Sequence, residues 1–117
     1  MTDGHHEPAE DVDGVLGALA DPMRRRILDL LAARGEATAT TLAGALPVSR
    51  QAVVKHLTVL DAAGLVSGRR AGREVRYAVR PAALDATARW MTALAGEWDR
   101  RLDRLRHTAE AAERDAT

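Results

Sequence analysis

The chain has 117 residues, enough for one domain with a single modest core, and its apolar content of 46% and charged content of 29% are typical of a globular protein. It contains no cysteine, which excludes disulfides and thiolate metal ligands. No apolar run approaches the roughly 20 residues that span a bilayer, and nothing resembles a signal peptide, so we expect a cytoplasmic protein with no membrane partner.

Positive charge is concentrated in one part of a chain whose formal net charge is zero. Residues 1–13 hold five acidic and no basic side chains, whereas residues 49–80 hold seven basic and two acidic side chains, a net charge of +5. A basic block of this kind favours an anionic partner such as nucleic acid. A solvated charged surface without a partner is the alternative.

The chain is expected to begin with an acidic tail followed by two short helices. Residues 1–11 are polar and lack periodicity, so we expect them to be disordered. Apolar residues at helical spacing predict helices over 12–20 and 22–33. Asp21 and Pro22 separate these helices, because Asp is a favoured N-cap and Pro suits the first helical position.

Two further helices are predicted over 40–46 and 49–63, joined by a tight turn at Pro47. Ser49 is the expected N-cap of the second helix, and Gly64 is expected to close it. The inward stripe of that helix consists of Val53, Leu57 and Leu60. The pair is a helix-turn-helix, a weak signal by itself because many helical proteins contain one.

Two strands are predicted over 65–70 and 74–79, around a Gly-containing turn at 71–73. Apolar and polar residues alternate along the second segment, as they do in a half-buried strand. A helix-turn-helix followed at once by an Arg-rich hairpin is typical of a winged helix. The expected fold class is therefore mostly α with a small β-hairpin.

A long helix is predicted over 82–113, with an apolar seam that keeps heptad spacing for more than three heptads. The seam consists of Leu84, Ala88, Met91, Ala95, Trp98, Leu102, Leu105 and Ala109. We expect this helix to pair with a second copy of itself in a two-fold dimer. Packing within the same chain is the alternative. One winged-helix domain is thus predicted over 12–113, followed by a short tail over 114–117.

Three segments resemble the ArsR-type (arsenic-repressor-like) bacterial transcription factors. LADPMRRRILDLL at 19–31 resembles their opening helices, SRQAVVKHLTVLDAAGLV at 49–66 their recognition helix, and the Arg-rich segment 69–77 their wing. The resemblance covers about 12–113. It implies a homodimeric winged-helix regulator, usually a repressor, that binds an imperfect inverted repeat in double-stranded DNA and dimerises through its first and last helices.

The recognition helix and the wing at 66–80 supply the candidate DNA contacts. Residues near the N-terminus of the helix reach base edges first, so Arg50 is expected to pair with guanine and Gln51 with adenine. Val54 can touch only a thymine methyl, and for His56 packing and a phosphate hydrogen bond are both open. Phosphate contacts are expected from Ser49 and Lys55, and phosphate or minor-groove contacts from the wing residues Arg69, Arg70 and Arg73.

The resemblance also sets expectations for dimerisation and for metals. The predicted dimer interface consists of Leu16, Leu19, Leu84, Met91, Leu94, Trp98, Leu102 and Leu105. Many family members sense metals, but the thiolate site needs cysteines. A second site would need a His near Asp85, and only the pair His107 and Glu110 fits its pattern. We therefore expect no metal and no cofactor, and the sequence identifies no small-molecule effector.

The main prediction is a DNA-binding repressor with no enzymatic activity, because no nucleophile–base pairing, Gly-rich phosphate loop or carboxylate pair is recognisable. Two alternatives stay open. One is a winged-helix module that binds a protein partner and does not read DNA; burial of the basic block in an assembly would favour it. The other is a metal-responsive repressor.

Overall fold

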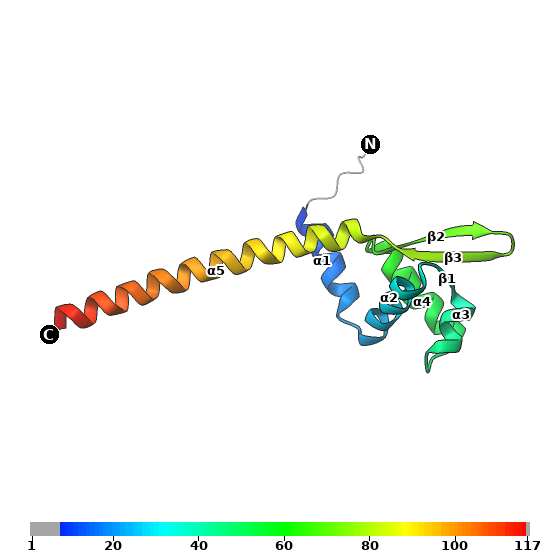
Figure 1. Ribbon diagram of the computed structural model, residues 1–117, viewed down its shortest axis with the longest axis horizontal. Coiled ribbons are helices and arrows are strands. Elements are labelled where there is room, and N and C mark those ends of the chain that lie inside the picture. The colour runs from blue at the N-terminus through cyan, green and yellow to red at the C-terminus, as the bar shows by residue number, and fades with distance from the viewer. Residues whose placement is uncertain (1–7, 117) are drawn as a thin grey trace. The chain divides into compact units, whose positions relative to one another are not determined.

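The computed structural model describes residues 8–116, and within them the chain forms five helices and three strands. Their order is α1 (Pro8–Leu19), α2 (Pro22–Arg34), β1 (Ala37–Thr38), α3 (Ala39–Ala45), α4 (Arg50–Ala62), β2 (Val66–Ala71), β3 (Glu74–Val79) and α5 (Pro81–Ala116) (Figure 1). The chain divides into two units. The first ends at Thr87, and the second is the part of α5 from Ala88 onward.

The predicted helices are all present, with shifts at their ends. α1 begins at Pro8, so residues 8–11 are helical instead of belonging to the expected tail. Proline suits the first position of a helix because its missing N–H would have no partner there. α5 continues to Ala116, past the predicted end at 113. The remainder of the predicted tail, residues 1–7, and Thr117 lie outside the described residues.

Side-chain caps fix where the helices of the helix-turn-helix begin. Thr38 Oγ1 accepts a hydrogen bond from the backbone N–H of Thr41 at 3.1 Å, at the start of α3. Ser49 Oγ accepts one from the N–H of Ala52 at 3.1 Å, at the start of α4. Each cap satisfies a backbone donor that the first helical turn leaves unpaired. The predicted role of Ser49 as N-cap is confirmed.

α4 ends in a Schellman motif around Gly64, which has a φ of 77°. The N–H of Gly64 donates to the carbonyl of Asp61 at 2.9 Å, and the N–H of Leu65 donates to the carbonyl of Leu60 at 2.9 Å. This pattern needs a residue in the left-handed region, which favours glycine. Leu60 and Leu65 are both fully buried, so the motif turns the chain from helix to strand within the core.

The hairpin is tighter than expected. Ala71 pairs with Glu74, so only Gly72 and Arg73 form the loop between β2 and β3. Gly72 has a φ of 66°, as required at the first loop position of a type II′ turn. Such turns match the right-handed twist of the flanking strands, which explains why a two-residue loop suffices here.

The sheet has a third strand that was not predicted, and its order is β1-β3-β2, all antiparallel. β1 is two residues long, too short to show a period of two. Tyr77 is at the centre of the sheet, paired with Ala37 on one side and Gly68 on the other. A Cβ on Gly68 would lie 3.1 Å from the Tyr77 ring, so the ring packs over this glycine.

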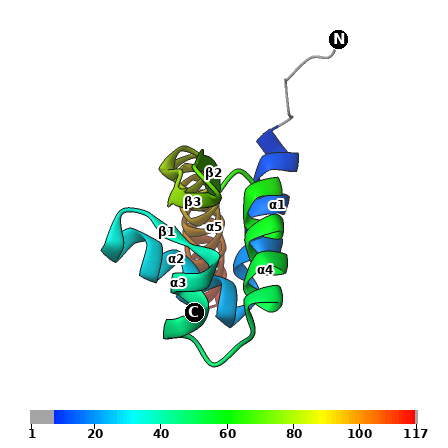
Figure 2. The ribbon, with the colours of Figure 1, turned by 90° about the vertical axis from the view of Figure 1, so that its right-hand side faces the viewer.

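The core of the first unit is drawn from its helices and from the start of the hairpin, with α4 lying beside α1 (Figure 2). The predicted inward stripe of α4 is confirmed, because all three of its residues are fully buried. The largest fully buried side chains are Val15, Ile27, Leu31, Leu42, Val53, Leu57, Leu60, Leu65 and Val66. All of them are aliphatic, so the core of this unit is packed without aromatic rings among its fully buried side chains.

The second unit has a different surface. Its large apolar residues are between 37% and 66% exposed: Trp90, Met91, Leu94, Trp98, Leu102 and Leu105. Two of the predicted dimer contacts in the first unit, Leu19 and Leu84, are half-buried and pack against the core of their own chain. Leu16 is 37% exposed. In the part of the chain that the structure describes, no helix combines the length and the apolar character needed to cross a membrane.

Candidate nucleic-acid interface

The first turn of α4 presents the two predicted base-reading side chains to solvent. Arg50 and Gln51 are exposed and directly follow the Ser49 cap. Arg50 Nε donates a hydrogen bond to Thr40 Oγ1 at 3.1 Å, so α3 orients this side chain. Lys55 is also exposed, one turn further along the same helix. An exposed, capped helix end of this kind can make bidentate hydrogen bonds to base edges, in which arginine donates both bonds to guanine and glutamine donates one and accepts one with adenine.

A concavity of about 370 Å³ lies between the start of α4 and the wing. Arg50 and Val54 of α4 and Thr40 of α3 line one side of it. Arg73 of the hairpin turn and Tyr77 of β3 line the other side. The structure thus brings together an arginine predicted to read bases and an arginine predicted to bind phosphate. Because the wing tip and the helix start border one hollow, both arginines can reach a single curved anionic surface.

Val54, a predicted DNA contact, is less exposed than that role would favour. It is half-buried and packs against the hydrophobic core, in addition to lining the concavity. Helical spacing places it on the border of the outward face, where it shares the concavity with residues of the wing. Only the exposed part of this side chain remains for a thymine methyl.

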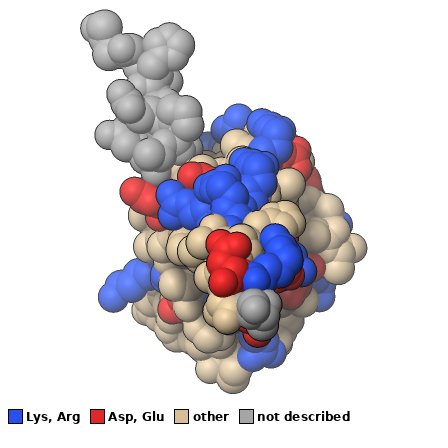
Figure 3. Space-filling model, turned by 90° about the vertical axis from the view of Figure 1, so that its left-hand side faces the viewer, with Lys and Arg blue, Asp and Glu red and all other residues tan. Residues whose placement is uncertain are grey.

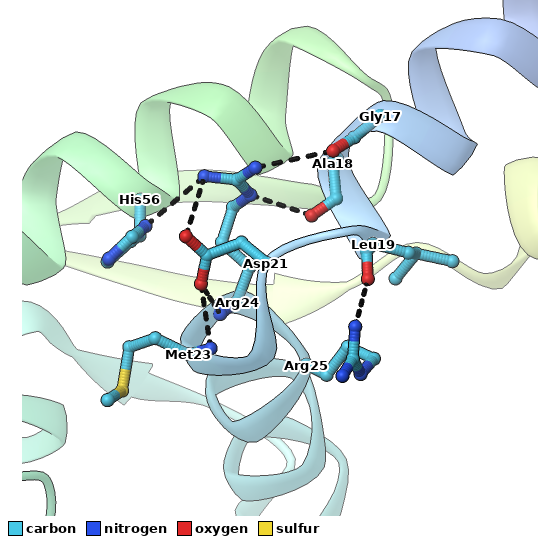
Figure 4. Close-up of polar contacts among 8 residues, drawn as sticks. All are labelled: Gly17, Ala18, Leu19, Asp21, Met23, Arg24, Arg25 and His56. Atoms are coloured by element: carbon cyan, nitrogen blue, oxygen red, sulfur yellow. Dashed lines mark hydrogen bonds and ion pairs between the residues drawn. The ribbon is translucent and has the colours of Figure 1, made fainter.

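His56 has a partner within the chain. Its ring is half-buried, and its Nδ1 lies 3.4 Å from Nη1 of Arg24 on α2 (Figure 4). Of the two roles left open by the sequence, the structure supplies a contact for the first, packing within the protein. Sequence spacing did not indicate this contact because the two residues are 32 positions apart.

The wing arginines differ in their surroundings. Arg69 forms an ion pair with Glu36, with Nη2 at 2.9 Å from Oε1, and its side chain is 60% exposed. Within residues 8–116, neither Arg70 nor Arg73 has an acidic side chain at ion-pair distance, and both are exposed. Exposed ion pairs contribute about 0–1 kcal/mol, so a phosphate can compete for Arg69, but Arg70 and Arg73 are more readily available.

Two arginines at the start of α2 have a structural role that sequence reasoning did not identify. Arg24 Nε donates to the carbonyl of Ala18 at 2.7 Å, and Arg25 Nη1 donates to the carbonyl of Leu19 (Figure 4). Cations are unfavourable at a helix N-terminus, but these two reach back to the C-terminus of α1, where the dipole favours them. An Arg run just after a predicted helix end is the signal that could have indicated this.

The surface carries charged side chains of both signs and a few potential metal ligands. Basic and acidic side chains both occur on the face drawn in Figure 3, in line with the net charge of zero. Within the described residues, no three His, Asp or Glu side chains come together as a metal site would require. His107 and Glu110 are exposed, one turn apart on α5. His5 and His6 lie outside the described residues.

Comparisons with known proteins agree on one class of protein, the helix-turn-helix transcriptional regulators. Residues 19–69 match a family described as a helix-turn-helix domain. The transcriptional repressor SdpR of Bacillus subtilis (strain 168) is 34% identical over 80 residues, covering 68% of this chain and 88% of SdpR. An ArsR-like transcriptional regulator from Rhodococcus sp. RHA1 has a TM-score of 0.78 and 44% identity, covering 86% of this chain and 94% of that one.

A further solved structure is similar over most of the chain. It is the homodimeric winged helix-turn-helix DNA-binding domain of a protein from Mycobacterium bovis, with a TM-score of 0.59 and 30% identity. The match covers 85% of this chain and 91% of that domain. SdpR and the Rhodococcus protein are named as transcriptional regulators, and the Mycobacterium bovis domain is named as DNA-binding.

Proposed function

This chain belongs to the ArsR-type family of winged helix-turn-helix transcriptional regulators, and we propose that it acts as a homodimeric repressor that binds an inverted-repeat operator. The observation that carries the proposal is the exposed first turn of α4, where Arg50 and Gln51 follow a capped helix start. The opposite stripe of the same helix is fully buried, so the helix is held with its polar end outward.

The proposed contacts divide into reading and positioning contacts. Arg50 and Gln51 read bases in the major groove, and the exposed edge of Val54 supplies an apolar contact. Ser49 and Lys55 contact phosphates, and the wing residues Arg69, Arg70 and Arg73 contact phosphates or the minor groove. His56 contributes through its place beside Arg24, and its Nε2 remains available for a phosphate. These roles follow from exposure, charge and the shared concavity.

Dimerisation is proposed to use α1 and α5. The exposed apolar residues of α5 continue a heptad seam, which is the pattern of a helix that pairs with another helix. Exposed apolar surface of this extent marks an interaction site. Leu16 on α1 joins this set, whereas Leu19 and Leu84 contribute only what their own core leaves exposed. The proposal assigns residues 12–113 to one DNA-binding and dimerisation domain.

The proposal includes neither a catalytic role nor a bound metal or cofactor. We propose a cytoplasmic regulator with no catalytic activity, no resident metal and no cofactor. A metal-responsive repressor, the alternative considered from the sequence, would need ligands beyond His107 and Glu110. A module that binds only protein would not need an exposed Arg50 and Gln51 beside an Arg-rich wing, so DNA is favoured over it.

The test is selection of duplexes from a random pool by the purified protein, followed by affinity measurements on the selected sequence. We expect a two-fold symmetric sequence whose affinity falls steeply with salt, because each neutralised phosphate releases counterions. Arg50→Ala should relax the sequence preference at one position by about 1–3 kcal/mol, whereas Arg73→Ala should weaken binding to all sequences alike. Equal affinity for selected and random duplexes, or a flat salt dependence, would contradict the proposal.

A further inference from the structure

We propose that Arg24 is a positioning residue that fixes the recognition helix α4 relative to α1, and thereby sets the half-site separation that the dimer accepts. This inference depends on the proposed function, because α1 is taken as part of the dimer interface and α4 as the DNA-reading helix. It concerns a residue that lies outside the surface expected to meet DNA.

The guanidinium of Arg24 joins three helices (Figure 4). Its Nε donates to the carbonyl of Ala18 at 2.7 Å and its Nη2 to the carbonyl of Gly17 at 3.3 Å, both in the last turn of α1. Its Nη1 lies 3.4 Å from Nδ1 of His56 on α4 and 3.6 Å from Oδ2 of Asp21, the N-cap of α2. One side chain therefore links α1, α2 and α4.

The chemistry of this contact defines which group donates. A guanidinium can only donate, so in the hydrogen bond between the two side chains Arg24 Nη1 is the donor and His56 Nδ1 is the acceptor. The planar fork reaches the α1 carbonyls with one edge and the imidazole with another. A lysine ammonium offers its donors from a single atom, so it cannot serve both sides of this junction at once.

Arg24 is held more firmly than the other arginines that form ion pairs. Its side chain is only 17% exposed, whereas that of Arg69 is 60% exposed. A guanidinium so largely removed from water is stable only when its N–H groups have hydrogen-bond acceptors, so the surrounding acceptors determine its position. The α1 carbonyls suit a cation because they lie at the negative end of the helix dipole.

The Asp21 carboxylate supports the same junction. Burial alone would raise the pKa of this group, but hydrogen bonds from the backbone N–H groups of Arg24 and Met23, with the nearby charge of the Arg24 guanidinium, lower it below its usual value. Asp21 therefore stays ionised beside Arg24 at neutral pH. The cap of α2 and the link to α4 are one electrostatic cluster.

The position of this cluster gives it a consequence for DNA binding. α1 carries Leu16 of the proposed dimer interface, and α4 carries Arg50 and Gln51. α1 and α4 are in direct contact, and His56 lies near the middle of α4. In a two-fold dimer, the angle between these helices determines how far apart the two copies of α4 stand. Half-sites lie about one helical turn apart, so a small rotation changes the accepted spacing.

The experiment measures binding to a series of duplexes whose two selected half-sites are moved apart or together by one base pair at a time. The variants are Arg24→Gln, Arg24→Lys and, as a matched control, Arg25→Gln. Arg25 also donates to an α1 carbonyl, but among the described residues it has no hydrogen bond or ion pair with α4, so its substitution removes a polar contact at the α1 terminus alone. Dimer mass and folded fraction are measured for each variant.

We expect wild type and Arg25→Gln to share a sharp preference for one spacing. Arg24→Gln and Arg24→Lys should both reduce the ratio of affinities between the best and next spacings by about fivefold or more. A purely stabilising role would lower all affinities together and leave that ratio unchanged. An unchanged ratio in folded, dimeric Arg24→Gln overturns the inference, as does an equal loss in Arg25→Gln.

If Arg24→Gln does not fold, His56→Ala decides, because it removes only the α4 end of the link and leaves the α1 contacts. A reduced spacing ratio then supports the inference, and a wild-type ratio overturns it. The loss of a phosphate contact by His56 would weaken every spacing alike and so is separable. If wild type itself selects no two-fold sequence, the proposed function fails, which is a result distinct from failure of the link.

Discussion

α4 and α5 carry the same kind of apolar stripe and meet different surroundings. In α4 the stripe of Val53, Leu57 and Leu60 is fully buried within its own unit. In α5, Trp98 and Leu105 of the stripe are 52% and 66% exposed. Periodicity therefore reveals which face of a helix is apolar, but it does not reveal whether that face meets the same chain or another one.

The largest effect should come from removing an α4 core side chain. Leu57→Ala leaves a cavity in a fully packed site and should lower the free energy of unfolding by about 2–5 kcal/mol. Urea denaturation followed by circular dichroism measures this change. Lys55→Ala on the exposed side of the same helix is the control and should change stability little. Similar losses in both variants would contradict the assignment of the two faces.

A charge on the α5 stripe tests the other half of the comparison. Trp98→Glu should raise the dimer dissociation constant by at least about thirtyfold, because a central aromatic contact is lost and a charge is desolvated. Sedimentation equilibrium measures the constant. Arg100→Glu, roughly 200° around the helix from Trp98, serves as the control. The proposal that the α5 stripe pairs with a second copy is contradicted if Trp98→Glu stays dimeric, or if Arg100→Glu dissociates as readily.

A smaller effect is expected where α4 ends. Gly64→Ala forces a side chain into a φ of 77°, which should lower the free energy of unfolding by about 1 kcal/mol. Space is not the cause, because an added Cβ would lie 3.9 Å from Ala83 Cβ. Gly14→Ala in α1 is the matched control, since Gly14 has open space and no positive φ. Thermal melts of the two variants should shift in opposite directions.

The smallest expected effect is on the pH dependence of stability, through the Asp21 carboxylate in the unit that contains α4. The folded pKa of Asp21 lies below its ordinary value of 3.8, so the stability that its ionised form contributes is fully present above 3.8. That contribution is lost as pH falls through the lower folded pKa. Asp21→Asn should therefore lose less stability than wild type over the same acid range. Parallel acid dependences in the two proteins would exclude this linkage.

Local patterns were sufficient to predict the helices, the hairpin and the exposure of most candidate DNA-contact residues. Ser49, Gly64 and the α4 stripe act within one helix, so spacing alone predicts them. Arg24 and Arg69 act on partners that the fold brings close, and no periodicity encodes a contact between positions 32 or 33 apart. β1 is missed for a different reason, because two residues cannot display a repeat.

Border positions are the remaining source of error. Val54 and His56 lie at the edge of the α4 stripe, where the neighbouring elements decide how much of each side chain is covered. The wing borders Val54 and α2 contacts His56, and both elements are distant in sequence. A helical projection assigns such residues to a face, but only tertiary packing determines their exposure.

The ion pair between Arg69 and Glu36 changes how this wing should respond to salt. Glu36 serves Arg69 as a counterion built into the protein. A phosphate that binds Arg69 must displace the Glu36 carboxylate. The freed carboxylate attracts a cation from solution, so this contact releases fewer counterions overall. If the proposed contacts form, we therefore expect the slope of log affinity against log salt, about 0.9 per neutralised phosphate, to be set mainly by the arginines and lysine that have no such carboxylate.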